Sequence, residues 1–191
     1  MISSICVFCA SSQAIRPEYF DAARGLGHLL GERRLRMVFG GGTAGLMGEA
    51  ARAVHAAGGT VTGVIPEALN REGVTYEVCD ELVITPGMRE RKAEMERRAD
   101  AFVALPGGFG TLEEILEHIT LRQLRYHPKP VVLVNTLDFY APLIRLFDHL
   151  IEERFARDDH RRLYHVAATP GEAMEYLDAY RPAELRDKWS G

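Results

Sequence analysis

Residues 106–114 read Pro-Gly-Gly-Phe-Gly-Thr-Leu-Glu-Glu and lie between an apolar run at 101–105 and a stretch with helical periodicity. This order predicts a strand, a glycine-rich turn and a helix. The first backbone N–H groups of such a helix have no partner within it, and the helix dipole adds positive charge there. The segment therefore predicts an anion site, most often one for phosphate.

A carboxylate near that site needs an explanation, because it repels phosphate. Thr111 and Glu114 have the spacing of a capping box, in which the hydroxyl and the carboxylate each accept a backbone N–H of the first turn. Spacing alone favours this capping role over a chemical one. The apolar positions of the same helix form a stripe that we expect to face the core: Leu112, Ile115, Leu116 and Ile119. Glu113 and Glu114 lie off that stripe, so at least one of them can face a cleft.

A second glycine-rich segment, residues 40–48, also follows a short apolar run. Gly40, Gly42 and Gly45 satisfy the G-x-G-x-x-G pattern of dinucleotide sites, but the acidic residue expected about 20 positions later would have to be Glu67, directly after a proline. The alternative is a tight turn with close packing of strand and helix. Two glycine turns at strand ends of one sheet can converge on one ligand, which favours a mononucleotide. The chain has no G-x-x-x-x-G-K-[ST] motif, so hydrolysis of a Mg-bound nucleoside triphosphate is not expected.

A charge-rich helix is predicted at residues 88–99. In it Met88 and Met95 share a face with Arg91 and Lys92, which puts two cations on the side that should be buried. Either the long side chains extend to solvent, or the cations meet an anion in the cleft. A fully solvated charged face is the alternative.

Apolar β-rich runs alternate with helical patterns along the chain. We expect strands at 3–9, 36–39, 60–65, 81–84, 100–105, 130–135 and 163–167, and helices at 18–33, 44–57, 88–99, 111–125, 139–155 and 171–179. This alternation predicts an α/β fold, a doubly wound, Rossmann-like parallel sheet with helices on both faces. Its ligand should bind at the carboxyl ends of the strands, near the point where the strand order reverses.

The expected organisation is a single domain at residues 1–180 and a polar tail at 181–191. Residues 66–80 show no clear periodicity and are expected to form a loop over the cleft. In the tail, Trp189 is expected either to fray or to dock on a partner subunit.

The composition excludes several classes of protein. The net charge of −4 disfavours a nucleic acid polymer as partner, and no apolar run approaches the roughly 20 residues of a membrane span. The N-terminus lacks the pattern of a signal peptide, and three cysteines do not make a disulfide framework, so a cytoplasmic location is expected. Cys6 and Cys9 form a C-x-x-C, but Cys6 lies inside an apolar run and reads as a core residue rather than a redox centre. No ligand spacing suggests a metal site.

Together these segments resemble one family, the cytokinin-activating phosphoribohydrolases of the Lonely-guy (LOG) type, which are often labelled lysine decarboxylases. The family signature is PGGxGTxxE preceded by an Arg-Lys helix, and residues 106–114 and 88–92 match it. Further likeness lies at 7–12, 40–48 and 63–66, and it covers most of residues 1–178. The resemblance implies a Rossmann-like fold, at least a homodimer, and cleavage of N6-substituted adenosine 5′-monophosphates to free base and ribose 5-phosphate. For this reaction we expect neither a metal nor an organic cofactor, because glycosidic cleavage needs only a carboxylate and positioning.

The resemblance places the catalytic pair of the family on Arg91 and Glu114. In an oxocarbenium-like transition state the carboxylate would stabilise charge near C1′ and orient or activate water, and the guanidinium would hold the phosphate. Arg89 stands where many members have His, and Phe109 where many have Tyr, so plain AMP stays open as a substrate. The expected substrate-binding residues are Ser11, Gly41, Gly42, Thr43, Glu72, Met88, Lys92, Gly107, Gly108, Phe109, Gly110, Thr111, Leu112, Glu113 and Thr120.

Two other functions compete with hydrolysis. Lysine decarboxylation through pyridoxal phosphate needs a lysine for the Schiff base, and none of the three lysines of the chain, Lys92, Lys129 and Lys188, lies in such a setting. A carrier of a nucleotide or of molybdenum cofactor on the same fold is the remaining alternative, because fold alone does not separate a carrier from an enzyme.

Overall fold

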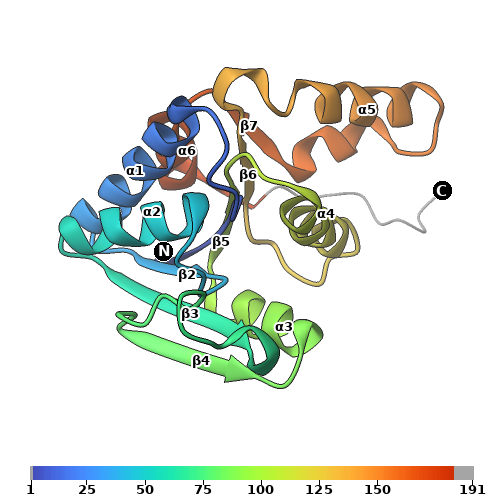
Figure 1. The fold of residues 1–191 in the computed structure, drawn as a ribbon. Helices are drawn as coiled ribbons and strands as arrows, with labels where there is room; N and C mark the ends of the chain where they lie inside the picture. Colours follow the sequence, from blue (N-terminus) through green and yellow to red (C-terminus); the bar gives the residue numbers. More distant parts are fainter. Residues whose placement is uncertain (1, 183–191) are drawn as a thin grey trace.

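The structure is a computed structural model that describes residues 2–182, so Trp189 and the rest of the tail from residue 183 lie outside the described part. Its centre is one seven-stranded sheet in the order β4-β3-β2-β1-β5-β6-β7, and every pair of neighbours is parallel (Figure 1). The strands are β1 (Ser4–Phe8), β2 (Arg36–Phe39), β3 (Thr60–Pro66), β4 (Glu81–Thr85), β5 (Ala101–Ala104), β6 (Val131–Val134) and β7 (His165–Ala167). All residues of β1, β5 and β6 are buried, as expected for strands covered on both faces.

The helices lie between the strands, as the periodicity predicts. They are α1 (Pro17–Glu32), α2 (Gly45–Ala56), α3 (Met88–Arg98), α4 (Phe109–Gln123), α5 (Ala141–Glu152) and α6 (Pro170–Ala179). Three short 3-10 turns complete the described elements: η1 (Glu67–Leu69), η2 (Thr136–Asp138) and η3 (Asp158–Leu163). Most boundaries agree with the sequence prediction to within about two residues, the usual uncertainty at element ends.

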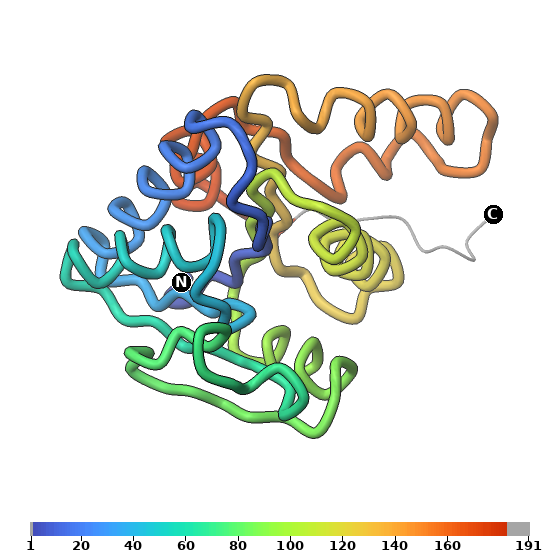
Figure 2. Tube along the Cα trace, viewed as in Figure 1, coloured from blue at the N-terminus to red at the C-terminus, as the bar shows by residue number. Residues whose placement is uncertain are grey.

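The sheet separates two apolar layers, because alternate side chains of a strand point to opposite faces. Ile5 and Val7 of β1 pack in a cluster with α1, α2 and α6. Cys6 and Phe8 pack on the other face with residues of α3, α4 and α5. Figure 2 shows the first group of helices gathered on one side of the sheet and α3 and α4 on the other. The predicted doubly wound sheet with helices on both faces is confirmed.

The strand order reverses between β1 and β5. The loops that follow β1, β2 and β5 therefore open at one edge of the sheet, where such folds bind ligands. Within residues 2–182, no helix combines the length and the apolar character that a membrane span needs.

Candidate functional site

A cleft of about 480 Å³ opens at the carboxyl ends of β1, β2, β3 and β5, at the predicted position. Residues of β3, of α2, α3 and α4, and of the segments that follow β1, β2, β3 and β5 line it: Cys9, Ala10, Ser11, Gly40, Gly42, Met47, Ile65, Leu69, Val74, Met88, Arg91, Gly108, Phe109, Gly110, Thr111, Glu113 and Glu114. Glycines, polar groups and one apolar wall meet in this space. That combination suits a ligand with an anionic end and a flat, weakly polar end.

The centre of the cleft is an ion pair between Arg91 of α3 and Glu114 of α4. Nη1 of Arg91 donates to Oε1 of Glu114 at 2.8 Å, and the two residues are each 8% exposed. Nε of Arg91 also donates to the carbonyl of Val64, at 3.1 Å, at the end of β3. A buried pair of this kind is weak evidence for stability, since desolvation offsets much of the attraction. A buried, fixed carboxylate beside an open cleft is instead typical of a chemical role.

Burial raises the pKa of the Glu114 carboxyl above its usual value, and the neighbouring Arg91 charge opposes that rise. The carboxylate is therefore a stronger base than a solvated glutamate. Such a group can accept a proton from water or stabilise positive charge on an adjacent carbon, as glycosidic cleavage requires.

The predicted capping box at Thr111 and Glu114 is wrong. Helix α4 begins at Phe109 with Gly108 as its N-cap, and no side chain caps it. Thr111 is therefore the third residue of the helix rather than its N-cap, and Glu114 lies a further three residues along, where its carboxylate reaches Arg91 instead of the N-cap. The capping-box pattern misplaced the start of the helix, because α4 begins at Phe109, two residues before Thr111.

The predicted core stripe of α4 is also corrected. Leu116 is 37% exposed, whereas Leu112 and Ile119 are only partly buried. The fully buried face of α4 lies about one position away and is mostly polar: Thr111, Glu114, Ile115, His118 and Arg122. Apolar periodicity could not reveal this face, because most of its members are residues that are usually solvated.

Lys92 of α3, which the sequence places on the same helix face as Arg91, does not line the cleft. Its Nζ forms ion pairs with Glu113 and, at 3.0 Å, with Glu117, both on α4. Arg91 and Lys92 therefore both meet carboxylates of α4, which resolves the choice between solvent and an anion that the sequence left open. Glu113 faces the cleft, and Lys92 partly neutralises it.

The first turn of α4 is open to the cleft. The first helical hydrogen bond runs from the N–H of Leu112 to the carbonyl of Gly108, so the preceding N–H groups of the helix have no intrahelical acceptor. The first turn contains no acidic residue. A Cβ atom added at Gly108 or at Gly110 would meet nothing within 4 Å. Unbonded N–H groups with open space above them are the features that an anion site needs.

The glycine turn between β2 and α2 is enclosed by contrast. Gly41 and Gly45 have φ angles of 72° and 59°, which only glycine adopts without strain. The carbonyl of Gly41 accepts the N–H of Tyr76 at 2.8 Å, and the N–H of Thr43 donates to Val74 at 2.9 Å. The predicted loop at 66–80 thus lies against this turn and, through Val74, borders the cleft.

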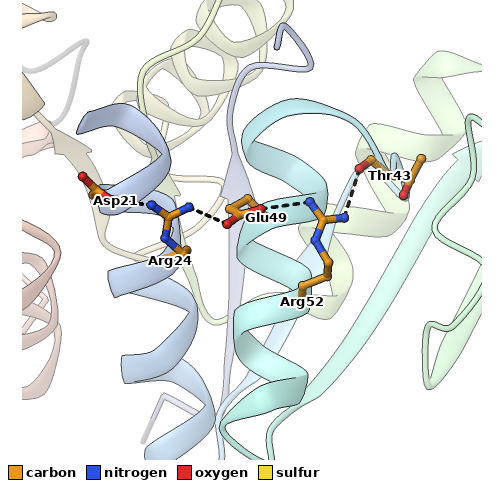
Figure 3. A network of polar contacts seen from close by, with 5 residues as sticks. All are labelled: Asp21, Arg24, Thr43, Glu49 and Arg52. Atoms are coloured by element: carbon orange, nitrogen blue, oxygen red, sulfur yellow. Dashed lines mark hydrogen bonds and ion pairs between the residues drawn. The ribbon is translucent and has the colours of Figure 1, made fainter. Parts of the chain in front are cut away.

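The outer side of the same turn is held by a chain of charged side chains (Figure 3). Nη1 of Arg52 donates to the carbonyl of Thr43 at 3.4 Å, and its Nη2 donates to Glu49 at 3.0 Å. Glu49 also accepts from Arg24 of α1 at 2.6 Å, and Arg24 bonds Asp21. The turn is therefore connected to α2 and, through Glu49, to α1.

The structure brings ten of the sequence-predicted site residues to the cleft: Ser11, Gly42, Met88, Arg91, Gly108, Phe109, Gly110, Thr111, Glu113 and Glu114. Seven others do not line it: Gly41, Thr43, Glu72, Lys92, Gly107, Leu112 and Thr120. Thr120 lies on a separate groove between α4, α5 and η3, and its hydroxyl donates to the carbonyl of Leu116 at 2.8 Å.

Seven lining residues are absent from the predicted site residues, although Gly40 belongs to the glycine pattern noted above: Cys9, Ala10, Gly40, Met47, Ile65, Leu69 and Val74. The sequence does indicate the position of Cys9, Gly40 and Ile65, because they lie at or just after the carboxyl ends of predicted strands, where the ligand site was expected. Leu69 and Val74 reach the cleft through the folding of a loop, which no local pattern indicates.

The cysteines fit a packing role. Cys6 and Cys9 are buried free thiols, and burial raises the pKa of both well above the usual range. A redox centre needs the opposite shift. Within residues 2–182, no three His, Cys, Asp or Glu side chains gather in a way that could hold a metal ion.

Known proteins resemble this chain over nearly its whole length. The sequence model of a family described as "Possible lysine decarboxylase" matches residues 47–177. Cytokinin riboside 5′-monophosphate phosphoribohydrolase LOG5 of Arabidopsis thaliana is 45% identical over 178 residues, which cover 93% of this chain and 78% of the relative. The phosphoribohydrolase LOG of Oryza sativa subsp. japonica is 48% identical over 178 residues, with 93% and 74% covered.

Among solved structures, the molybdenum cofactor binding protein from the phototrophic bacterium Rippkaea orientalis has a TM-score of 0.70 at 22% identity. The match covers 94% of this chain and 97% of that protein. At this identity the likeness supports the fold alone.

Proposed function

The chain belongs to the family described as "Possible lysine decarboxylase", whose relatives above are named cytokinin riboside 5′-monophosphate phosphoribohydrolases, and we propose that it is such a hydrolase. It cleaves the N-glycosidic bond of adenosine 5′-monophosphates, including N6-substituted ones, to the free base and ribose 5-phosphate. The observation that carries the proposal is the buried Arg91–Glu114 pair beside the open first turn of α4.

In this proposal the 5′-phosphate binds the first turn of α4. The N–H groups of Phe109, Gly110 and Thr111 lie in the unbonded first turn, and Gly108 leaves the space above them free. The base then lies against the apolar wall, which includes Met47, Ile65 and Met88. Binding energy from the phosphate, remote from C1′, positions the reacting carbon.

Glu114 acts on the glycosidic bond. As the bond from C1′ to the base nitrogen lengthens, positive charge develops on the ribose, and the carboxylate stabilises it. Water attacks C1′ and transfers a proton to Glu114, while the base leaves with the bonding electron pair and takes up a proton from solvent. Glu114 then returns its proton to solvent, so that one water is consumed in total. The raised pKa of the carboxyl suits this transient proton transfer.

Arg91 orients Glu114 in this proposal. Its guanidinium donates to Val64 and to Glu114 at the same time, which fixes the carboxylate in one rotamer. We prefer this role to the expectation that Arg91 holds the phosphate, because Nε and Nη1 of Arg91 already donate to Val64 and Glu114. The two residues form the catalytic pair, and Lys92 balances the charge of Glu113 beside it.

The decarboxylase in the family description does not fit the described lysines. Lys92 is paired with two glutamates, and Nζ of Lys129 donates to the carbonyl of Glu96 at 2.7 Å. Neither lines the cleft. Lys188 lies outside the described residues. The proposed reaction needs neither a pyridoxal cofactor nor a metal, and activity should survive dialysis against a chelator.

The proposal includes a homodimer in the cytoplasm, with residues 1–180 acting as one catalytic unit. Helix α5 has no fully buried residue although it is strongly amphipathic. Its Phe147 and Leu150 line an apolar groove together with Leu116 and Ile119 of α4. A second copy of the chain would cover this groove, and sedimentation analysis tests that. All three cysteines are free thiols, as is usual in a reducing compartment.

The test compares AMP and an N6-alkyl AMP with the matching nucleosides, with chromatography to detect the released base. We expect both nucleotides to be cleaved and both nucleosides to be inert, since the phosphate site supplies the positioning. Equal rates with and without the 5′-phosphate contradict the proposal. Tight binding of the nucleotides without base release would instead support a carrier.

A further inference from the structure

The enclosed glycine turn depends on a segment that is distant in sequence. Residues 74–76 accept the N–H of Thr43 and donate to the carbonyl of Gly41, and Gly42 and Thr75 form an antiparallel bridge. Gly40 and Gly42 of this turn line the cleft, and so does Val74. Any shift of the segment therefore changes the wall of the cleft directly.

The segment itself is anchored by the side chain of Tyr76. Tyr76 is only 6% exposed, and its ring packs edge-on against Phe39 of β2, with the centroids 6.1 Å apart. The residues before it, 67–73, are exposed and thus supply little packing. The side chain of Tyr76 thus adds buried contacts to the backbone hydrogen bonds that hold the segment against the turn.

A histidine on α2 connects this tyrosine to an aspartate four residues later. Nδ1 of His55 lies 3.0 Å from the hydroxyl of Tyr76, and Nε2 lies 2.9 Å from Oδ2 of Asp80. The same carboxylate oxygen accepts the N–H of Val61 of β3 at 2.7 Å. His55 thus joins the two ends of the turn Tyr76–Asp80 to α2 and, through Asp80, to the sheet.

The chemistry of the imidazole fits this bridge. The Asp80 carboxylate accepts, so Nε2 carries a proton and Nδ1 of the neutral ring accepts from the Tyr76 hydroxyl. In the protonated ring both nitrogens donate, and the tyrosine oxygen can accept. Both ring nitrogens can therefore keep their partners whether the imidazole is neutral or charged. The bridge is lost only when residue 55 cannot form a hydrogen bond with both Tyr76 and Asp80.

We propose that His55 is a positioning residue for nucleotide binding, which acts by holding Tyr76 and thereby the wall of the cleft at Val74 and Gly42. This inference rests on the proposed function, and it assigns a role to a side chain outside the cleft. Arg91 and Glu114 belong to other elements and do not contact His55, so the chemical step itself should be little affected by its loss.

The experiment compares H55L, Y76F and H55Q with wild type, and H28L serves as the control because His28 is an exposed histidine on α1. Hydrogen exchange of the Thr43 and Tyr76 amides reports on the segment without any need for turnover. We expect faster exchange at both amides in H55L and Y76F, and wild-type exchange in H28L. If exchange at the Thr43 and Tyr76 amides is unchanged in H55L and Y76F, the bridge does not hold the segment and the proposal is overturned.

Steady-state kinetics with AMP then test the positioning role. We expect KM to rise about tenfold in H55L while kcat stays within about twofold, the pattern of lost uniform binding. H55Q offers one N–H and one oxygen and should restore KM to within about threefold of wild type. A fall in kcat with KM unchanged, or faster exchange with wild-type KM, overturns the role. Y76F keeps its ring and removes only the hydroxyl, so it decides the question if H55L does not fold.

Failure of the proposed function is distinguishable from failure of this inference. If wild type does not cleave AMP, the hydrolase proposal fails, and calorimetric AMP affinity replaces KM in the same comparison. A weaker affinity in H55L together with faster exchange would then support the positioning role, and an unchanged affinity would overturn it.

Discussion

The two glycine-rich turns of the cleft have similar compositions and different surroundings. In the turn after β2, a Cβ atom at Gly40 would collide with Nη2 of Arg91, and one at Gly42 would lie 2.8 Å from Cε of Met47. In the turn before α4, the space above Gly108 and Gly110 is empty to 4 Å. Gly40 and Gly42 make room for atoms of the protein, as Gly107 does for Thr111, whereas Gly108 and Gly110 leave open space at the first turn of α4.

The glycines of the two turns therefore differ in what they make possible. Gly40 lets the guanidinium of Arg91 reach Glu114, so it belongs to the machinery that fixes the carboxylate. Gly108 has φ −86°, which any residue can adopt, and no neighbour that requires its small size. A glycine without a structural reason beside unbonded N–H groups points to a ligand that approaches the backbone closely.

The largest effect is expected when the carboxylate next to the enclosed turn loses its charge. Glu114→Gln keeps the shape and an oxygen that can accept from Arg91, but it cannot stabilise an oxocarbenium ion. We expect turnover of AMP to fall by about a hundredfold or more, as for the loss of other transition-state charge stabilisers. Calorimetry should still detect AMP binding, and circular dichroism should confirm folding.

The neighbouring substitution is the matched control for this prediction. Glu113→Gln removes a partner of Lys92 at the surface of the cleft and should retain most of the activity. If Glu113→Gln is inactive and Glu114→Gln is not, the catalytic role belongs to Glu113.

Substitution in the enclosed turn should affect both stability and rate. In Gly40→Ala the added methyl displaces the Arg91 guanidinium, which is held by Val64 and Glu114 and cannot move without breaking a buried contact. We expect the free energy of unfolding to decrease by about 1–3 kcal/mol, as in other overpacked sites. Turnover should fall by more than about tenfold, because the carboxylate loses its fixed position. Thermal denaturation and steady-state kinetics measure the two effects, and a stable, fully active Gly40→Ala would contradict the assignment.

The same substitution in the open turn should affect binding alone. For Gly108→Ala we expect a change of less than about 0.5 kcal/mol in the free energy of unfolding. The methyl enters the space assigned to the phosphate and lengthens a charge-assisted hydrogen bond, a loss of about 1 kcal/mol that raises KM about fivefold. Parallel melts and kinetics of Gly40→Ala and Gly108→Ala test the comparison most directly. A destabilised Gly108→Ala with wild-type KM would show that the open turn is also structural.

The pH dependence gives the smallest and most specific effect. Burial raises the pKa of Glu114, and the ionised form is the active one in the proposed mechanism. Activity is therefore lost as pH falls through this raised pKa, and the acid limb of kcat/KM should lie at a higher pH than for a solvated glutamate. The residual activity of Glu114→Gln should lack that limb. A limb in the ordinary glutamate range in wild type would show that another group controls it.

The order of strands and helices was readable from the sequence because it depends on local patterns. Apolar β-rich runs predicted all seven strands, and glycine turns marked the edge of the sheet where the cleft opens. The Arg-Lys helix and the PGGxGTxxE segment together indicate the family from the sequence alone. The location of the cleft followed from the reversal of strand order, which alternating elements imply.

Only the tertiary structure decided which side chains meet. Arg91 and Glu114 are 23 residues apart, and their contact depends on how α3 and α4 pack on the sheet. The spacing of Thr111 and Glu114 suggested a capping box because local patterns do not show where a helix preceded by glycines begins. The polar buried face of α4, the enclosure of Gly40 and the bridge from His55 to Tyr76 arise from contacts between distant segments, and their energies depend on burial that a sequence does not display.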